Sequence, residues 1–189
     1  MSANRAKLPL FAPLLRYPHP AQQAAADQAV AELADHAEVA HRLRGFSEFL
    51  HGHTQKKLQE KYTQTFEINP SVALEVGYHL FGLAYQRGQF LARAKQAADE
   101  LGIETGTELA DHLPTMLDLA AALDEETALS LIQEAIFPAV RHMAGGFDKT
   151  GTGFGQVVIA LHQFLQDHYE CIVYAPVEQA PEEEVSSHA

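Results

Sequence analysis

Residues 74–102 read LEVGYHLFGLAYQRGQFLARAKQAADELG, and this stretch decides the fold. Its apolar residues recur at the three- and four-residue spacing that places side chains on one face of an α-helix. Gly102 follows the last of them, where a glycine commonly ends a helix. The spacing predicts a long central helix from about Leu74 to Leu101, with an apolar face formed by Val76, Leu80, Leu83, Ala84, Leu91, Ala94, Ala98 and Leu101.

One cation and three glycines interrupt this predicted helix. Arg87 lies four residues from both Leu83 and Leu91, so its stem falls on the buried face. Its charge then needs a carboxylate partner, or the side chain extends to the rim, and the sequence favours the two alternatives equally. Gly77, Gly82 and Gly88 each weaken a helix, which indicates close packing of another segment against it.

The rest of the chain also has helical periodicity, and no segment alternates apolar and polar residues for long enough to predict a sheet. We therefore expect an all-α, single-domain helical bundle of about seven to nine helices over residues 1–172. The last residues, 173–189, are rich in glutamate, proline and serine, which predicts a disordered acidic tail. The other expected helices cover about 8–17, 20–37, 38–51, 55–66, 114 onward, 124 onward and 154–169, with Pro138 kinking or interrupting the one before last and Gly145–Gly146 ending it.

Composition excludes several classes of partner. The 189 residues include 13 Lys plus Arg and 25 Asp plus Glu, for a net charge of −12, which argues against binding nucleic acid or an anionic membrane surface. No apolar run is long enough for a membrane-spanning helix. The N-terminal apolar stretch is broken by Pro9, Pro13 and Arg16, so it does not resemble a secretion signal. A single cysteine, Cys171, fits a reducing cytoplasm.

The sequence offers weak evidence for catalysis or for a metal site. Two Glu-x-x-His pairs, Glu38 with His41 and Glu48 with His51, fall in one predicted helix about 15 Å apart along its axis, too far to share a metal. Cys171 follows Glu170, whose charge would raise the pKa of the thiol and favours an inert cysteine. The glycine-rich residues 149–155 follow a helix rather than a strand, unlike a phosphate-binding loop. We predict no catalytic and no metal-binding residues.

A denser group of polar residues occurs in the segment ELADHLPTMLDL at 108–119. Asp111, His112 and Pro114 lie where a loop meets the start of a helix, and Asp111 is a candidate cap for that helix. Free backbone N–H groups at such a junction can bind a ligand or the chain itself.

Several motifs together resemble a known family. They are YTQTF at 62–66, GYHLFG at 77–82, Arg87–Gly88, and ELADHLP at 108–114, with LLRYP at 14–18 and IFPA at 136–139 in the expected order. In this combination the chain, over about residues 8–170, closely resembles the NarJ branch of the TorD/NarJ family of redox-enzyme maturation chaperones. It departs from the family pattern at residues 71–75, which lack an expected aromatic residue, and at Ala110, which replaces a proline.

The resemblance implies a non-catalytic, cytoplasmic chaperone for a nitrate-reductase-like molybdoenzyme. Such a protein binds the basic N-terminal leader of the apo catalytic subunit and delays docking or export until molybdopterin guanine dinucleotide is inserted. It holds no cofactor permanently, and cofactor-delivery proteins are further expected partners. The resemblance implies neither nucleic-acid binding nor membrane insertion.

Charge along the chain fits a basic client. Between Lys95 and Arg141 there is no lysine or arginine, and ten acidic residues form what we call the acidic block: Asp99, Glu100, Glu104, Glu108, Asp111, Asp118, Asp124, Glu125, Glu126 and Glu134. Such a block would attract a basic peptide in a salt-dependent way.

We therefore expect the leader to bind as a helix in a groove between the long central helix and the helix that begins at Pro114, lined by Tyr62, Phe66, Tyr78 and His79. Asp111 and Glu108 would meet leader cations, and His79 and His112 would make the affinity depend on pH near 6.5. The predicted client-binding residues are Tyr62, Phe66, Tyr78, His79, Glu108, Asp111 and His112, and the predicted structural or hinge residues are Gly82, Arg87, Gly88 and Pro114.

Two other classes remain open on the sequence. One is a metal-binding helical-bundle enzyme, and the other is a helical regulatory or nucleotide-binding protein. The cations that a DNA-binding helix would need, at 42, 44, 56, 57 and 61, are divided between two helices and a loop.

Overall fold

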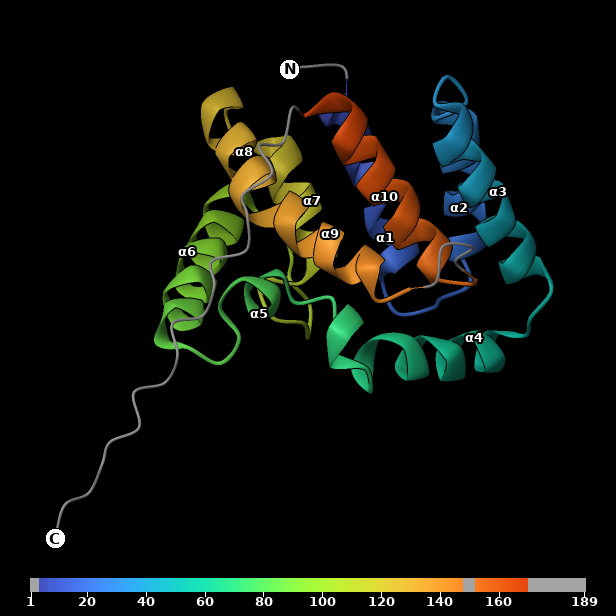
Figure 1. The fold of residues 1–189 in the computed structure, drawn as a ribbon, viewed down its shortest axis with the longest axis horizontal. Coiled ribbons are helices and arrows are strands. Elements are labelled where there is room, and N and C mark those ends of the chain that lie inside the picture. Colours follow the sequence, from blue (N-terminus) through green and yellow to red (C-terminus); the bar gives the residue numbers. More distant parts are fainter. Residues whose placement is uncertain (1–3, 148–151, 170–189) are drawn as a thin grey trace, which may run out of the picture.

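The computed structural model describes residues 4–147 and 152–169, and within them every regular element is helical. The prediction of an all-α fold is confirmed, and the described residues form one helical domain (Figure 1). The predicted tail at 173–189 lies outside the described residues. The α-helices are α1 (Ala12–Leu15), α2 (Gln22–Glu32), α3 (Ala37–His51), α4 (Gln55–Tyr62), α5 (Val76–Phe81), α6 (Tyr85–Leu101), α7 (Leu113–Ala122), α8 (Glu125–Leu131), α9 (Phe137–Gly145) and α10 (Gly155–His168).

Short helical turns connect several of these helices. Two are 3-10 turns, η1 (Arg5–Leu10) and η3 (Pro70–Val72), and two are π-turns, η2 (Thr63–Glu67) and η4 (Ile132–Ile136). Turn η4 joins α8 to α9 without a break, so 125–145 form one continuous rod. The sequence predicts a kink or an interruption at Pro138. The rod is not interrupted there, because Pro138 lies in the first turn of α9 directly after the π-turn. Gly146 follows α9, as predicted.

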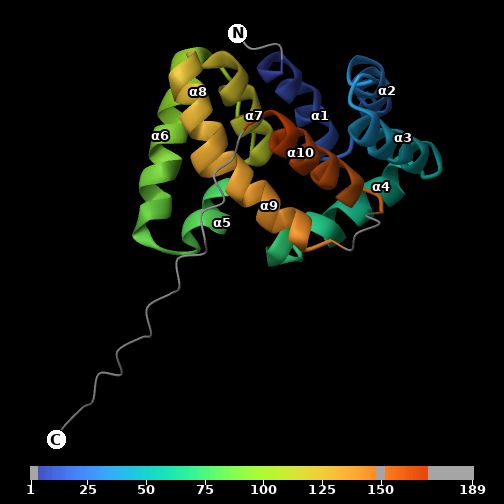
Figure 2. The same cartoon turned by 45° about the horizontal axis from the view of Figure 1, so that its top comes forward.

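Helix α10 lies in the middle of the domain, between α9 and the α2–α3 pair (Figures 1 and 2). Helices α5 and α6 lie on one side of the domain and α4 runs along the lower edge in Figure 1. Buried aromatic side chains connect these parts. The ring of Phe154, at the start of α10, packs at 5.4–5.7 Å from the rings of Phe46, Tyr62 and Phe66. This contact fixes α3, α4 and η2 against α10.

The long central helix predicted over 74–101 is two helices. Gly82, with φ of +57°, ends α5, and α6 begins only at Tyr85. Leu83, expected on the buried face, is 90% exposed. A glycine adopts this positive φ at little cost, and the periodicity continues across the turn, so spacing alone did not reveal the break. Gly102, with φ of +67°, ends α6 as predicted.

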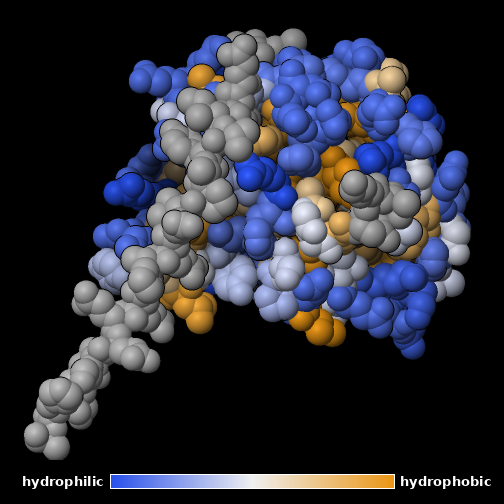
Figure 3. All heavy atoms as spheres, in the orientation of Figure 1, coloured by the Kyte–Doolittle hydropathy of each residue, from blue (hydrophilic) through white to orange (hydrophobic). Residues whose placement is uncertain are grey.

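The surface seen in the orientation of Figure 1 is largely hydrophilic, with separate apolar patches (Figure 3). No helix in the described part of the chain is both long and apolar enough to cross a membrane.

A buried glutamine ties α2 to the end of α1. The Nε2 of Gln22 donates hydrogen bonds to the carbonyl oxygens of Pro13, Leu14 and Arg16, each at 3.2 Å. These carbonyls have no helical partner because α1 ends at Leu15.

Replacing this amide by an alkyl group should therefore destabilise the fold. We expect Gln22→Leu to lower the free energy of unfolding by about 1–3 kcal/mol, because buried carbonyls lose their donor. Gln28→Leu, on the same helix but exposed, should change it by less than about 0.5 kcal/mol. Urea denaturation of both variants measures this, and equal losses would contradict the assigned role of Gln22.

Candidate functional site

The segment before α5 pairs with the segment before α7. The N–H of Val76 donates to the carbonyl of Asp111 at 2.9 Å, and the N–H of Leu113 donates to the carbonyl of Leu74 at 2.8 Å. This isolated antiparallel bridge sets Glu75 opposite His112. It brings together two of the motifs, 77–82 and 108–114, that are distant in sequence.

The side chain of Asp111 fixes α5 to its neighbours. It is completely buried, and its Oδ2 accepts hydrogen bonds from the Gly77 N–H at 3.1 Å and from the Arg87 Nε at 3.4 Å. Of the two alternatives for Arg87, the carboxylate partner is the correct one. The Arg87 guanidinium also lies 5.7 Å from the centre of the Tyr78 ring. Burial raises the pKa of Asp111, although Arg87 opposes the rise.

The sequence predicts Asp111 as a cap of the helix that follows it. The structure shows that it does not cap this helix. The N-cap position of α7 belongs to His112, and Asp111 instead accepts from the first turn of α5. We call the contact among Asp111, Gly77 and Arg87 the Asp111 clasp. Its carboxylate has no exposed surface to offer an incoming cation.

Gly77 is required by the closeness of this contact. A Cβ at this position would lie 2.7 Å from Oδ2 of Asp111 and 2.9 Å from Cδ1 of Phe90. The close packing expected at the glycines thus occurs at Gly77. The expectation of close packing is wrong for Gly82 and Gly88, where a Cβ would meet nothing within 4 Å.

A pocket of about 230 Å³ opens on one side of the bridge, and we call it the acidic pocket. Three carboxylates and two aromatic rings are among its lining residues, which are Tyr62, Phe66, Glu67, Ala73, Leu74, Glu75, Glu108 and His112. Burial raises the pKa of Glu75, and the nearby carboxylates of Asp111 and Glu108 raise it further, against Arg87. The Tyr62 hydroxyl donates to the Leu15 carbonyl at 3.0 Å, so this ring is held in place.

His112 is an almost fully buried polar residue in the wall of the acidic pocket. It is 4% exposed, and burial, with a smaller contribution from Arg16, lowers its pKa to about 4. Within the described part of the chain, its Nδ1 has no hydrogen-bond partner. The pH response near 6.5 expected of His112 is therefore wrong, because burial keeps the ring neutral at that pH.

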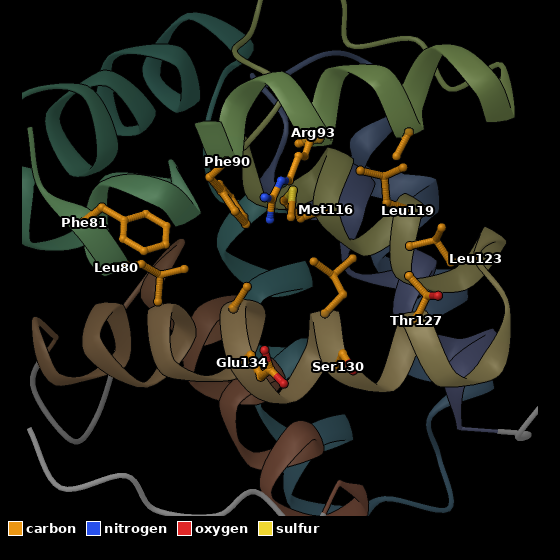
Figure 4. Close-up of a pocket in the computed structure, with 14 residues that line it drawn as sticks. Leu80, Phe81, Phe90, Arg93, Met116, Leu119, Leu123, Thr127, Ser130 and Glu134 are labelled. Carbon is orange, nitrogen blue, oxygen red and sulfur yellow. The ribbon is translucent and has the colours of Figure 1, made fainter. Parts of the chain in front are cut away.

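A second and more apolar recess lies at the other end of α5, and we call it the apolar groove. It encloses about 370 Å³ between α6, α7 and the α8–η4 rod (Figure 4). Two charged side chains line the groove, Arg93 on α6 and Glu134 on the opposite wall (Figure 4). Its lining residues are Leu80, Phe81, Phe90, Arg93, Ala94, Ala97, Met116, Leu119, Leu123, Thr127, Ser130, Leu131, Glu134 and Ala135.

The predicted site residues are thus distributed over several places. Tyr62, Phe66, Glu108 and His112 meet in the acidic pocket, and Asp111 lies in the clasp. Tyr78 packs on Arg87, while Gly82 forms the turn between α5 and α6. Gly88 lies in α6, and Pro114 is buried in the first turn of α7.

His79 contacts neither recess. Its Nε2 donates to the Ala73 carbonyl at 2.6 Å, and its Nδ1 lies 2.8 Å from Nδ1 of His142 on α9. Burial, with a smaller effect of His142, lowers the pKa of His79. This contact holds α5 to α9.

Some residues that line the two recesses were not predicted as site residues from the sequence. Glu67 and Glu75 complete the acidic pocket, but single glutamates near helix ends carry no distinguishing pattern. The groove residues Leu80, Phe90 and Met116 read as ordinary core positions. Gly82 was the one sequence signal for the break between α5 and α6, since a glycine in a helical pattern can mark a turn.

Among residues 4–147 and 152–169, no three His, Cys, Asp or Glu side chains are grouped as a metal site would need. Cys171 and residues 149–151 of the glycine-rich stretch lie outside the described residues.

Two glycine substitutions should have opposite effects on stability. Gly77→Ala should lower the free energy of unfolding by about 1–3 kcal/mol, because the new methyl group overlaps Asp111 and Phe90. Gly88→Ala, inside α6 and facing open space, should raise it by about 0.5–1 kcal/mol. Thermal and denaturant unfolding measure both changes, and a loss at Gly88 as large as that at Gly77 would contradict the clasp.

His112 should make stability fall as the pH falls. Its pKa is about 4 in the folded chain, below the ordinary 6.5, so the unfolded chain takes up a proton first. The contribution of the neutral ring to the free energy of unfolding is complete above pH 6.5. It falls by up to ~1.4 kcal/mol per pH unit between pH 6.5 and pH 4. His112→Gln should remove this slope.

Glu75 and Asp111 change the stability in the opposite direction as the pH falls, because their pKa values are raised in the folded chain. The difference between the wild-type and His112→Gln profiles, from denaturant unfolding at pH 7, 6 and 5, isolates His112. His41→Gln, at an exposed position on α3, is the control. Parallel profiles for wild type and His112→Gln would show that this ring does not stay neutral on folding.

Comparison with known proteins assigns the family. Residues 22–170 match the family model described as "Nitrate reductase delta subunit". Over 131 residues, 69% of this chain and 71% of the relative, the chain is 28% identical to a Bacillus subtilis (strain 168) protein described as "Probable nitrate reductase molybdenum cofactor assembly chaperone NarJ". Because the family match covers well over half of the chain and includes every motif between 62 and 139, the protein belongs to the nitrate reductase delta subunit family, of the NarJ/TorD type.

Proposed function

We propose that the protein is a non-catalytic assembly chaperone for a nitrate-reductase-like molybdoenzyme. It binds the N-terminal leader of the apo catalytic subunit in the cytoplasm and keeps the client open for insertion of molybdopterin guanine dinucleotide. The cofactor belongs to the client, and cofactor-delivery proteins are further partners. Family membership favours this function over a metal-bundle enzyme or a helical regulator. The apolar groove, with Glu134 of the acidic block on one wall, is the observation that carries it.

The apolar groove suits the apolar face of a helical leader. Its walls come from α6, α7 and the α8–η4 rod, and the leader was expected between the first two of these. The residues expected to line that groove, Tyr62, Phe66, Tyr78 and His79, are not among its lining residues. A helix-in-groove complex is held mainly by apolar anchors at helical spacing, and the groove offers leucine, phenylalanine and methionine side chains for them (Figure 4). Phe81 is 36% exposed at its edge, so a ligand could cover it further.

The acidic block supplies the attraction for a basic leader. Some of its members are engaged inside the chain: Asp111 in the clasp, Asp118 with Arg16 at 2.9 Å, Asp99 with Lys95, and Asp124 as the cap of α8. Six others are exposed, namely Glu100, Glu104, Glu108, Glu125, Glu126 and Glu134. Exposed charges of one sign accelerate encounter with a basic peptide, and salt screens the effect.

A matched pair of substitutions tests the groove. Phe81→Ser should weaken binding of the N-terminal peptide of the organism's own nitrate-reductase-like catalytic subunit by about tenfold, because one apolar anchor is lost. Leu83→Ser, two residues later and 90% exposed outside the groove, should change affinity less than about twofold. Isothermal titration calorimetry at low and high salt measures both.

We expect binding to the wild-type chain to weaken with salt for the reason given above. No binding of the leader peptide at low salt would contradict the proposed function. Equal effects of the two substitutions would contradict the groove as its site.

A further inference from the structure

Three helices present residues at helical spacing to the apolar groove. Its floor is α7, which packs against both α6 and η4 and contributes Met116, Leu119 and Leu123. The lining residues of the α6 wall are at 90, 93, 94 and 97, and those of the rod are at 127, 130, 131, 134 and 135. Residues three or four apart lie on one face of a helix, so each helix turns one continuous face to the groove. The groove is thus bordered lengthwise by helices, and α5 lies at one end of it (Figure 4).

The two walls of the groove differ in charge. Arg93 is the charged lining residue of α6 and Glu134 is that of the rod, and both side chains are exposed. Neither forms an ion pair within residues 4–147 and 152–169. The rod wall also carries the hydroxyl groups of Thr127 and Ser130, whereas the other lining residues of α6 are apolar. An unpaired cation on one wall and an unpaired anion on the other thus border the groove (Figure 4).

These charges complement a particular kind of leader helix. A helix whose apolar stripe rests on α7 turns one flank to α6 and the other flank to the rod. A cation on the flank facing the rod lies near Glu134, and a carboxylate on the other flank lies near Arg93, so each unpaired charge gains a partner. A leader with cations on both flanks would instead place one of them beside Arg93, where like charges repel. The groove therefore fits a leader with a cation on one flank and a carboxylate on the other.

Walls of opposite charge also distinguish the two directions in which a helix can lie. Turning a helix end for end, with its apolar stripe still on α7, exchanges its two flanks between the walls. In one direction both of its charges meet opposite charges, and in the other direction both meet like charges. An exposed pair of opposite charges changes an equilibrium by about two- to fivefold, so two such pairs favour one direction by about tenfold.

We propose that Arg93 and Glu134 fix the direction in which the client leader lies in the apolar groove. Because the leader is the occupant, this role rests on the proposed function. Apolar anchors hold the leader in the groove, and the two charges decide which of its ends lies beside α5. The direction matters for assembly, since it decides whether the rest of the catalytic subunit leaves the groove past Leu80 or past Leu123, which lie at its two ends (Figure 4).

Two designed peptides test the direction of binding on the full chain. They share one stripe of leucines at helical spacing. In the first peptide each leucine follows a glutamate and precedes an arginine, and in the second peptide the two charges are exchanged. Because the neighbours of a stripe residue lie on opposite flanks of a helix, the two peptides should lie in opposite directions. A nitroxide spin label at the N-terminus should broaden the methyl resonances of Leu80 for one peptide and those of Leu123 for the other.

A charge-exchanged variant assigns this effect to the two residues. In Arg93→Glu combined with Glu134→Arg, each peptide should reverse its direction, so the other leucine is broadened. The matched control is Lys57→Glu combined with Glu60→Lys, which exchanges an exposed ion pair on α4 and should leave both directions as in the wild-type chain. The same direction for both peptides, no reversal in the groove variant, or an equal reversal in the control would overturn the proposal.

The native leader peptide, labelled in the same way, separates this proposal from the proposed function. It should lie in one direction on the wild-type chain and lose or reverse that preference in the charge-exchanged variant. If the designed peptides behave as expected and the native leader does not bind, the proposed function fails and the two residues still orient a bound helix. If the native leader binds in one direction that the variant does not change, the proposed role of Arg93 and Glu134 fails and the proposed function stands.

Discussion

A single buried carboxylate determines the arrangement of this domain on its functional side. Asp111 accepts from the first turn of α5 and from Arg87 on α6, and the backbone on both sides of it pairs with the strand-like segment before α5. Three separate segments of the chain are thus fixed by one side chain that has no contact with water. Breaking such a buried pair by removing one partner is strongly destabilising, because a charge is then left alone in the interior. The acidic pocket and the apolar groove lie at opposite ends of α5, so both recesses depend on the clasp for their shape.

Much of the fold could be predicted from the sequence because helical periodicity is a local property. The all-α class and the ends of helices at Gly102 and Gly146 needed only neighbouring residues. The break between α5 and α6 was not predicted, because the apolar spacing continues through Gly82 and Leu83 and does not show which conformation the glycine adopts. Of the kink or interruption expected at Pro138, the interruption does not occur, for a related reason. A π-turn at Ile132–Ile136 shifts the register of the rod, and the proline then falls in a first turn, where it costs little.

The candidate site was predictable where several residue types coincide and not where one residue acts alone. Tyr62, Phe66, Glu108 and His112 come from two distant motifs, and they meet in one pocket. Asp111 was given the wrong partner, because a capping residue usually accepts a hydrogen bond from its own helix and Asp111 accepts one from α5. Glu67 and Glu75 gained their significance only from the fold, which brings two ordinary glutamates beside Glu108.

The tight fit at Gly77 also has an evolutionary consequence. A Cβ there would overlap Asp111 and Phe90 and would touch Cγ of Arg87, so four positions share one small volume. Substitutions at positions in contact are energetically non-additive. Drift at any one of them is therefore constrained by the other three, and a tolerated change at position 77 requires a compensating reduction in size at 90 or 111. Homologous chains should consequently vary at these four positions together, as one inherited unit, while exposed neighbours such as Gln86 and Gln89 change independently.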